Sequence, residues 1–178
     1  MQYFIGIVPP LDYKEKIISF QKNWESNGFI NVVEPHITLK AQGGLTPDKR
    51  WLDDLETLCR DFPSFRITLT EPKFFGDYVV YLSMQSQELY QLHNKIVRLI
   101  NPSDSLIKKY FELEDFVPHL TLGKTYFGMN SNELNEMAIE AQRLLMPYPT
   151  FDVNQIRVYQ EIEPLEYITY KDIALKQQ

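Results

Sequence analysis

Cysteine is almost absent from this sequence, and no long uninterrupted apolar run occurs in it. The one cysteine, Cys59, excludes an intramolecular disulfide and a cysteine-rich zinc site. It lies on the apolar face of a predicted helix, which indicates a buried thiol in a reducing compartment. No apolar stretch approaches the roughly 20 residues that span a bilayer, and residues 1–10 lack the basic start of a signal peptide. We therefore expect a soluble, cytoplasmic protein with no membrane partner.

An excess of basic residues is also missing. The 18 Lys and Arg residues are outnumbered by 24 Asp and Glu residues, which gives a net charge of −6. Binding to long nucleic acid relies on many Lys and Arg contacts with phosphates, so we expect no long nucleic-acid partner. A small nucleotide or an RNA terminus is compatible with this charge. The sequence does not indicate an oligomeric state.

Two short segments share one pattern and contain two of the three histidines. Residues 35–39 read Pro-His-Ile-Thr-Leu, and residues 118–122 read Pro-His-Leu-Thr-Leu. Successive side chains of a strand point to opposite faces, so the histidine and the threonine of each motif share a face. We predict two strands, each of which presents an imidazole and a hydroxyl on one side and apolar side chains on the other.

The order of predicted elements repeats near residue 76. Each half reads strand, helix, motif strand, helix, strand, and 83 residues separate both His36 from His119 and Trp51 from Leu134. This regularity indicates an internal duplication. We expect an α+β fold with two pseudo-symmetric lobes whose motif strands face one central cleft. The predicted boundaries are 1–73 and 77–159 for the two repeats and 165–176 for a closing strand, within one domain of residues 1–178.

Two further segments are predicted to form strands. Residues 29–33 should lead as a strand into the first motif. Residues 151–159 should form one strand with a bulge, because the apolar alternation shifts phase between Val153 and Ile156.

The two motifs together contain the groups that phosphodiester cleavage needs. A base must deprotonate the nucleophile, an acid must protonate the leaving oxygen, and donors must stabilise the charge on the phosphate oxygens. Histidine titrates near pH 6.5, so one imidazole can be neutral while the other is charged. We predict His36, His119, Thr38 and Thr121 as catalytic residues, with no metal and no cofactor. Lys40, on the His36 face by alternation, is a predicted phosphate contact.

In a duplicated α+β frame, these paired His-x-Thr motifs resemble the signature of the 2H phosphoesterases, which include 2′-5′ RNA ligases and 2′,3′-cyclic phosphodiesterases. The resemblance implies antiparallel sheets that line the central cleft, with helices outside. It also implies action on 2′,3′-cyclic phosphates or 2′-5′ linkages of RNA ends or small nucleotides, by hydrolysis or ligation. One histidine would activate water and the other would protonate the leaving ribose oxygen, with His119 favoured as the base. Where many members have an arginine after the second motif, Lys124 keeps the charge but loses the bidentate fork, and we expect it to bind substrate.

Other residues near the motifs have simpler interpretations. His93 lies on an apolar helix face and is predicted to be a core or boundary residue. Gly123 would leave room for a ligand, whereas Tyr126 and Phe127 are expected to pack rather than to stack on a base. Two alternative functions stay open: a metal-dependent hydrolase that uses both motif histidines as ligands, and a non-catalytic nucleotide or RNA-end binding module. No acidic residue stands at a ligand spacing beside either motif, which disfavours the metal alternative.

Overall fold

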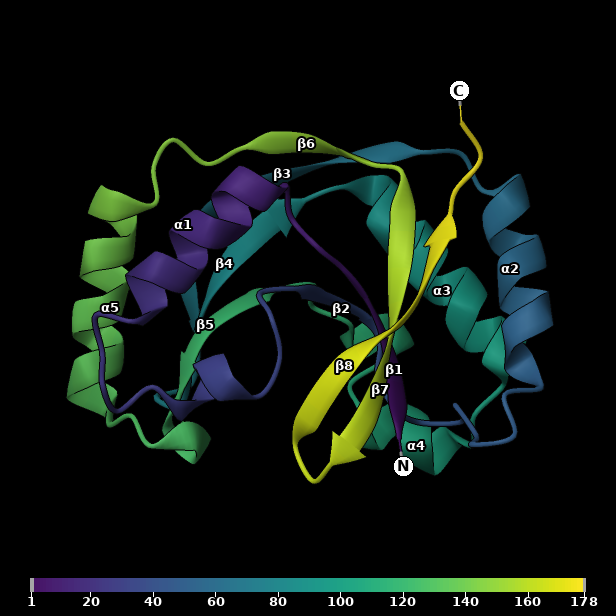
Figure 1. Ribbon diagram of the computed structural model, residues 1–178, viewed down its shortest axis with the longest axis horizontal. Coiled ribbons are helices and arrows are strands. Elements are labelled where there is room, and N and C mark those ends of the chain that lie inside the picture. Colours follow the sequence, from purple (N-terminus) through teal and green to yellow (C-terminus); the bar gives the residue numbers. More distant parts are fainter. Residues whose placement is uncertain (1, 178) are drawn as a thin grey trace.

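One antiparallel sheet organises the computed structural model, which describes residues 2–177 (Figure 1). The strand order is β6-β3-β4-β5-β2-β1-β7-β8. The predicted α+β fold with antiparallel strands and outer helices is confirmed, and the strands form a single curled sheet. The strands are β1 (Tyr3–Ile7), β2 (Ile37–Lys40), β3 (Phe65–Phe75), β4 (Val79–Gln85), β5 (Leu120–Lys124), β6 (Thr150–Val153), β7 (Gln155–Glu163) and β8 (Glu166–Ala174).

Helices cover the outer face of the sheet in two groups. Helices α1 and α5 pack against the half that contains β4 and β5, and α2 and α3 pack against the half that contains β2 and β8 (Figure 1). Within residues 2–177, no helix is both long enough and apolar enough to cross a membrane. The helices are α1 (Leu11–Gln21), α2 (Trp51–Asp61), α3 (Gln87–Ile100), α4 (Asp104–Lys109) and α5 (Ser131–Leu144), with short 3-10 turns η1 (Gly28–Asn31), η2 (Leu113–Asp115) and η3 (Thr125–Phe127).

The sheet combines strands from both halves of the chain. Strand β3 pairs with β4, and β7 pairs with β1. The two motif strands, β2 and β5, are neighbours in the middle of the sheet, where Ile37 pairs with Leu120. Segments that are far apart in the sequence are thereby brought side by side at the centre of the molecule.

Two of the predicted strands are different in the structure. The chain before the first motif forms the 3-10 turn η1, in which Phe29 packs on the ring of Phe127 at 5.3 Å. Residues 151–159 form two strands, because β6 pairs with β3 at one edge of the sheet while β7 pairs with β1 in the other half. The phase shift near Asn154 therefore marks a crossing between two parts of the sheet, and the bulge prediction was wrong.

A bulge follows the threonine of the first motif. Thr38 lies opposite Gly6, but the next pair along the ladder joins Lys40 to Ile5, so Leu39 is an extra residue. A bulge of this kind reverses the alternation of the side chains that follow it. Lys40 consequently lies on the same side of the sheet as the core residue Ile5, and no longer on the side of Thr38.

The second motif strand has the same irregularity. Thr121 lies opposite Tyr81, but Gly123 lies opposite Val80, so the residue between Thr121 and Gly123 is extra. Val80 is fully buried in the core, and Gly123 shares its side of the sheet. Lys124, one residue further, therefore lies on the same side of the sheet as Thr121.

Candidate active site

His36 lies directly before β2, and its ring is held from several directions. Its Nδ1 atom lies 2.8 Å from the carbonyl oxygen of Glu34. A carbonyl oxygen can only accept, so Nδ1 carries the proton and Nε2 is the atom available to a substrate. Phe4 and Tyr159 stack on each other at 4.5 Å, and their centroids lie 5.0 and 5.6 Å from the imidazole. Gly6 makes this packing possible, because a Cβ atom there would lie 3.2 Å from the Tyr159 ring.

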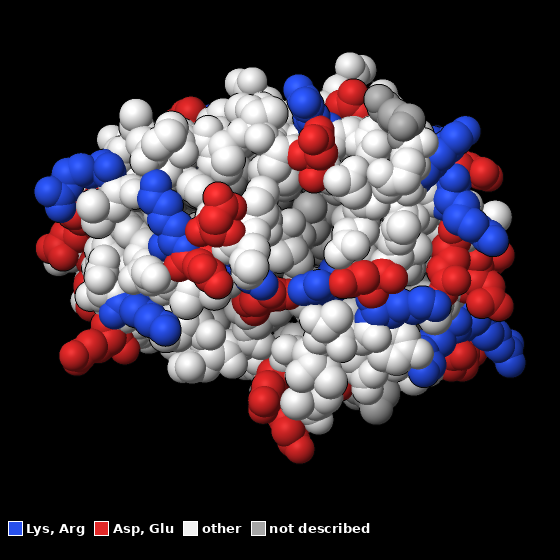
Figure 2. All heavy atoms as spheres, turned by 45° about the horizontal axis from the view of Figure 1, so that its top comes forward, with Lys and Arg blue, Asp and Glu red and all other residues white. Residues whose placement is uncertain are grey.

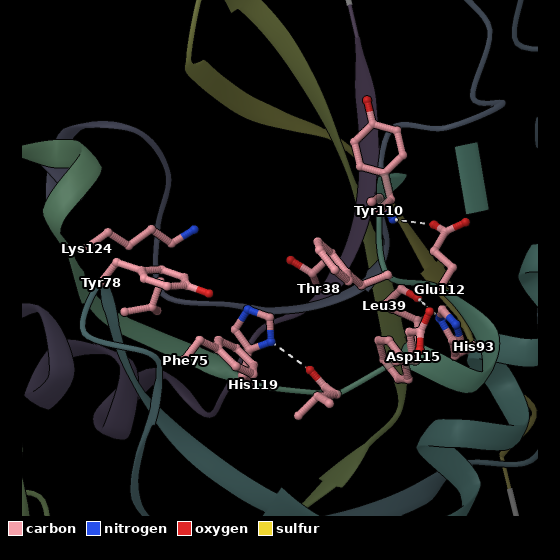
Figure 3. Close-up of a pocket in the computed structure, with 15 residues that line it drawn as sticks. Thr38, Leu39, Phe75, Tyr78, His93, Tyr110, Glu112, Asp115, His119 and Lys124 are labelled. Atoms are coloured by element: carbon pink, nitrogen blue, oxygen red, sulfur yellow. Dashed lines mark hydrogen bonds between the residues drawn. The ribbon is translucent and has the colours of Figure 1, made fainter. Parts of the chain in front are cut away.

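His119 lies directly before β5 and has the same kind of support. Its Nδ1 atom donates to the carbonyl oxygen of Val117 at 2.7 Å, the contact drawn as a dashed line in Figure 3. Phe75 and Tyr81 stack on each other at 4.3 Å, and their centroids lie 5.0 and 5.4 Å from the imidazole. Both histidines thus expose Nε2, and neither Nε2 atom has a hydrogen-bond partner among residues 2–177.

The pairing of the motif strands places the histidines and threonines together. In an antiparallel ladder, the neighbours of a residue pair lie opposite each other in reverse order. Because Ile37 pairs with Leu120, each motif histidine comes opposite the threonine of the other motif. All four predicted catalytic side chains therefore lie on one face of the sheet, where the sequence expected them.

The two threonine hydroxyls are available for a ligand. Thr38 is half-buried and points into the space beside His119 in Figure 3, and Thr121 is buried. Neither hydroxyl hydrogen-bonds to any residue that the structure describes. Their free donors and the two Nε2 atoms provide the four polar groups that an enclosed phosphate would need.

Burial keeps both motif histidines neutral in the ligand-free protein. The pKa of His36 is lowered to about 4, mainly by burial, and the positive charges of Lys124 and protonated His119 contribute to this shift. Burial also lowers the pKa of His119, and Lys124 adds to this effect. The positive charge of Lys124 acts on both imidazoles, so the three groups share one electrostatic environment.

Lys124 is the basic side chain that reaches this site. It is half-buried, and burial lowers the pKa of its ammonium group. In Figure 3 it extends beside Tyr78 toward the space near Thr38 and His119. Its ammonium group lies 5.1 Å from the centre of the Phe29 ring, and it forms no ion pair or hydrogen bond within residues 2–177. An anionic ligand would supply the missing countercharge.

Lys40 does not reach the site, which corrects the expectation that it contacts the phosphate. The side chain is completely buried, because the bulge at Leu39 turns it toward the core side. Its Nζ atom lies 2.8 Å from Glu112 Oε1, 2.9 Å from the Ala41 carbonyl oxygen and 2.5 Å from the Gly43 carbonyl oxygen. An ammonium group has three donors, and protein acceptors occupy all of them.

The residues that follow the second motif also differ from one expectation. A Cβ atom on Gly123 would lie 2.5 Å from the Met129 sulfur and 2.9 Å from the Met137 sulfur. The space beside Gly123 is therefore filled by methionine and offers no room for a ligand. Tyr126 is exposed, and Phe127 packs on Phe29 as the sequence indicated.

A cavity of about 430 Å³ opens beside His119. Thr38, His119 and Lys124 line it, and His36 does not. Its volume falls in the usual range of small-molecule sites. Five aromatic side chains also line the cavity, namely Phe75, Tyr78, Tyr110, Phe111 and Phe116. These residues follow no period in the sequence and so could not be singled out from it, although three of them cluster directly before the second motif.

Charge around the cavity is sparse. Besides Lys124, the charged side chains that line it are Glu112, which is paired with Lys40, and Asp115. On the face drawn in Figure 2, Lys and Arg side chains are scattered among Asp and Glu and do not gather into a broad basic patch. The cavity therefore offers one cation to a ligand, which suits a single phosphate group.

The third histidine, His93, is buried, as the sequence indicated, and it also lines the cavity beside His119. Burial lowers its pKa to about 4. Within the described part of the chain, no group of three or more His, Cys, Asp or Glu side chains could hold a metal ion.

Comparisons with known proteins agree on one family. Residues 15–163 match the sequence model of the 2′-5′ RNA ligase superfamily. An RNA 2′,3′-cyclic phosphodiesterase of Methanocaldococcus jannaschii is 26% identical over 170 residues, which cover 89% of this chain and 90% of that protein. The crystal structure of TT0787 of Thermus thermophilus has a TM-score of 0.68 at 14% identity over the whole of both chains. E. coli LigT complexed with 3′-AMP has a TM-score of 0.63 at 23% identity, over 99% of this chain and 98% of that one.

Proposed function

Since this chain belongs to the 2′-5′ RNA ligase superfamily, we propose that it is a phosphoesterase that opens the 2′,3′-cyclic phosphate of an RNA end or a small nucleotide. The proposal depends on one observation. In both His36 and His119, Nδ1 donates to a backbone carbonyl, which leaves Nε2 of each ring free on the same face of the sheet. The relative from Methanocaldococcus jannaschii is an RNA 2′,3′-cyclic phosphodiesterase, which favours hydrolysis of a cyclic phosphate over ligation.

We propose that His119 is the acid and His36 the base, the reverse of the assignment that the sequence favoured. The cavity lies beside His119, so a nucleoside bound there places its ribose oxygen next to that ring. His36 would accept a proton from water as the water oxygen bonds to phosphorus. His119 would give its proton to the ribose oxygen as the phosphorus–oxygen bond breaks, which yields a nucleoside monophosphate.

The remaining site residues would bind the substrate. Thr38 and Thr121 would donate hydrogen bonds to the non-bridging phosphate oxygens, and Lys124 would add its positive charge. The aromatic lining of the cavity suits a nucleobase, because stacking on an aromatic ring contributes about 1–3 kcal/mol per base. We assign Lys40 a structural role, since its donors are occupied by the protein.

Substitution of either motif histidine tests this function directly. We expect His36→Ala and His119→Ala each to lower kcat on a nucleoside 2′,3′-cyclic monophosphate by roughly 10²- to 10⁴-fold, the usual effect of a general acid or base. Thermal unfolding of both variants serves as the control for folding. Wild-type turnover by either variant would refute the role of that histidine. A wild-type protein that binds the nucleotide without turnover would instead support the binding-module alternative.

A chelator separates the proposal from metal-dependent hydrolysis. If the two imidazoles act as acid and base, activity should survive an excess of chelator without loss. A complete loss that added divalent metal restores would show that the motif histidines serve as metal ligands.

A further inference from the structure

Residues 110–117, called the cavity wall below, form one side of the cavity and end two residues before His119. They connect α4 to the second motif without joining the sheet. Phe111 and Leu113 have φ angles of 52° and 58°, a left-handed conformation that is unfavourable for bulky residues. The cavity wall therefore depends on side-chain contacts from elsewhere in the protein to keep this shape.

His93 on α3 provides one such contact. Its Nε2 atom accepts a hydrogen bond from the Leu113 N–H at 2.9 Å, so its Nδ1 atom must carry the proton that it donates to the Leu39 carbonyl oxygen at 2.7 Å. The ring also stacks on Phe116 with centroids 3.6 Å apart and an angle of 3° between the planes. One neutral imidazole thus joins the bulged residue of β2 to two positions of the cavity wall.

The buried pair of Lys40 and Glu112 provides a second contact between the same two segments. The two side chains are 0% and 2% exposed, and their ion pair measures 2.8 Å. The same carboxylate oxygen accepts from the Ala41 N–H at 3.2 Å. Three consecutive residues at the end of β2 and just after it are therefore joined to the cavity wall, Leu39 through His93, and Lys40 and Ala41 through Glu112. Thr38 precedes this junction, and the Val117 carbonyl that orients His119 follows it.

We propose that His93 is a positioning residue for the substrate, which holds the cavity wall against β2 and so fixes the nucleoside relative to the two motif imidazoles. The proposal rests on the function proposed above. His93 itself would not contact the phosphate, because both of its nitrogen atoms are bonded within the protein. His93 contacts the cavity wall at Leu113 and Phe116, and not at Val117, whose carbonyl orients His119. Loosening the two contacted positions should therefore weaken binding of the nucleoside part of a ligand and leave binding of its phosphate intact.

Calorimetric binding of two probes separates these effects. The variant His93→Leu removes both hydrogen bonds and keeps a buried side chain of similar size. We expect its dissociation constant for 3′-AMP to rise roughly tenfold, as expected for the loss of about one to two buried hydrogen bonds. The dissociation constant for inorganic phosphate should change less than about twofold. The variant His93→Gln can still accept and donate at these positions and should recover most of the affinity for 3′-AMP.

The control is Leu92→Ala on the same helix, because Leu92 is fully buried. It should lower stability and leave the ratio of the two dissociation constants unchanged. If His93→Leu does not fold, Glu112→Gln tests the same wall with a milder change. We expect this variant to lose affinity for 3′-AMP and to keep its affinity for inorganic phosphate. An unchanged ratio in the folded variants, or an equal loss for phosphate and 3′-AMP, would overturn the proposal. Binding is measured without turnover, so this result is independent of whether the wild-type protein hydrolyses cyclic phosphates.

Discussion

A single local hydrogen bond decides which nitrogen of each motif histidine faces the substrate space. In both motifs Nδ1 donates to the backbone carbonyl two residues earlier, at Glu34 and at Val117. The sequence could predict that each imidazole shares a face with a threonine, because that follows from strand alternation. It could not predict the tautomer, because any residue type at the earlier position supplies a carbonyl.

The contribution of the two motif threonine hydroxyls to catalysis is the easiest to isolate. Valine has nearly the same shape as threonine, and neither hydroxyl has a partner among residues 2–177. We therefore expect Thr38→Val and Thr121→Val to leave the free energy of unfolding nearly unchanged. Each should lower kcat by roughly 10²-fold, the effect of removing one donor to a developing negative charge.

Thr68→Val is the matched control for these two variants, since Thr68 lies on β3 and bonds the Thr150 hydroxyl on the molecular surface. Its kcat should equal the wild-type value. Steady-state kinetics and chemical denaturation provide both measurements. Unchanged kcat in both motif variants would show that the hydroxyls do not stabilise the transition state.

At the scale of the strand, the bulges explain why Lys40 lies away from the site whereas Lys124 reaches it. Alternation correctly described the motifs as far as each threonine. Beyond that point the extra residues Leu39 and Leu122 reverse the phase, so Lys40 turns to the core side and Lys124 to the site. A bulge depends on how a strand pairs with its neighbour, and β1 and β4 are distant in the sequence. Local pattern alone could not reveal it.

Replacing each lysine with methionine should separate the two roles. We expect Lys124→Met to weaken binding of inorganic phosphate roughly tenfold with little change in the free energy of unfolding, because its ammonium group has no protein partner. Lys40→Met should leave phosphate binding nearly unchanged. It should lower the free energy of unfolding by about 3 kcal/mol, since it strands the buried Glu112 carboxylate.

Calorimetry and denaturation measure both quantities for this pair of variants. A greater loss of phosphate affinity in Lys40→Met than in Lys124→Met would contradict the assigned roles. It would show that Lys40 lies on the His36 face, as simple strand alternation predicts.

At the scale of the whole molecule, the order of elements could be predicted but their pairing could not. Helices with a clear apolar face and strands with regular alternation carry local signals. The neighbours β2 and β5, and β7 and β1, are far apart in the sequence and are chosen by long-range packing. We infer an internal duplication in which each repeat contributes its closing strand to the other half of the sheet. Its support is the matching pairs β1–β2 and β4–β5, with equivalent bulges and equivalent aromatic contacts to the histidines.

If His36 and His119 hold one phosphate between them, both imidazoles should respond to it, and histidine NMR titration with inorganic phosphate measures that response. Burial keeps the pKa of both residues low in the free protein, with His36 at about 4. A bound anion favours the imidazolium form, so both pKa values should rise, and phosphate should bind more tightly as the pH falls from 7. His93 lies outside the pair and should titrate unchanged. A rise at only one motif histidine, or an equal rise at His93, would show that the two motif histidines do not hold the phosphate between them.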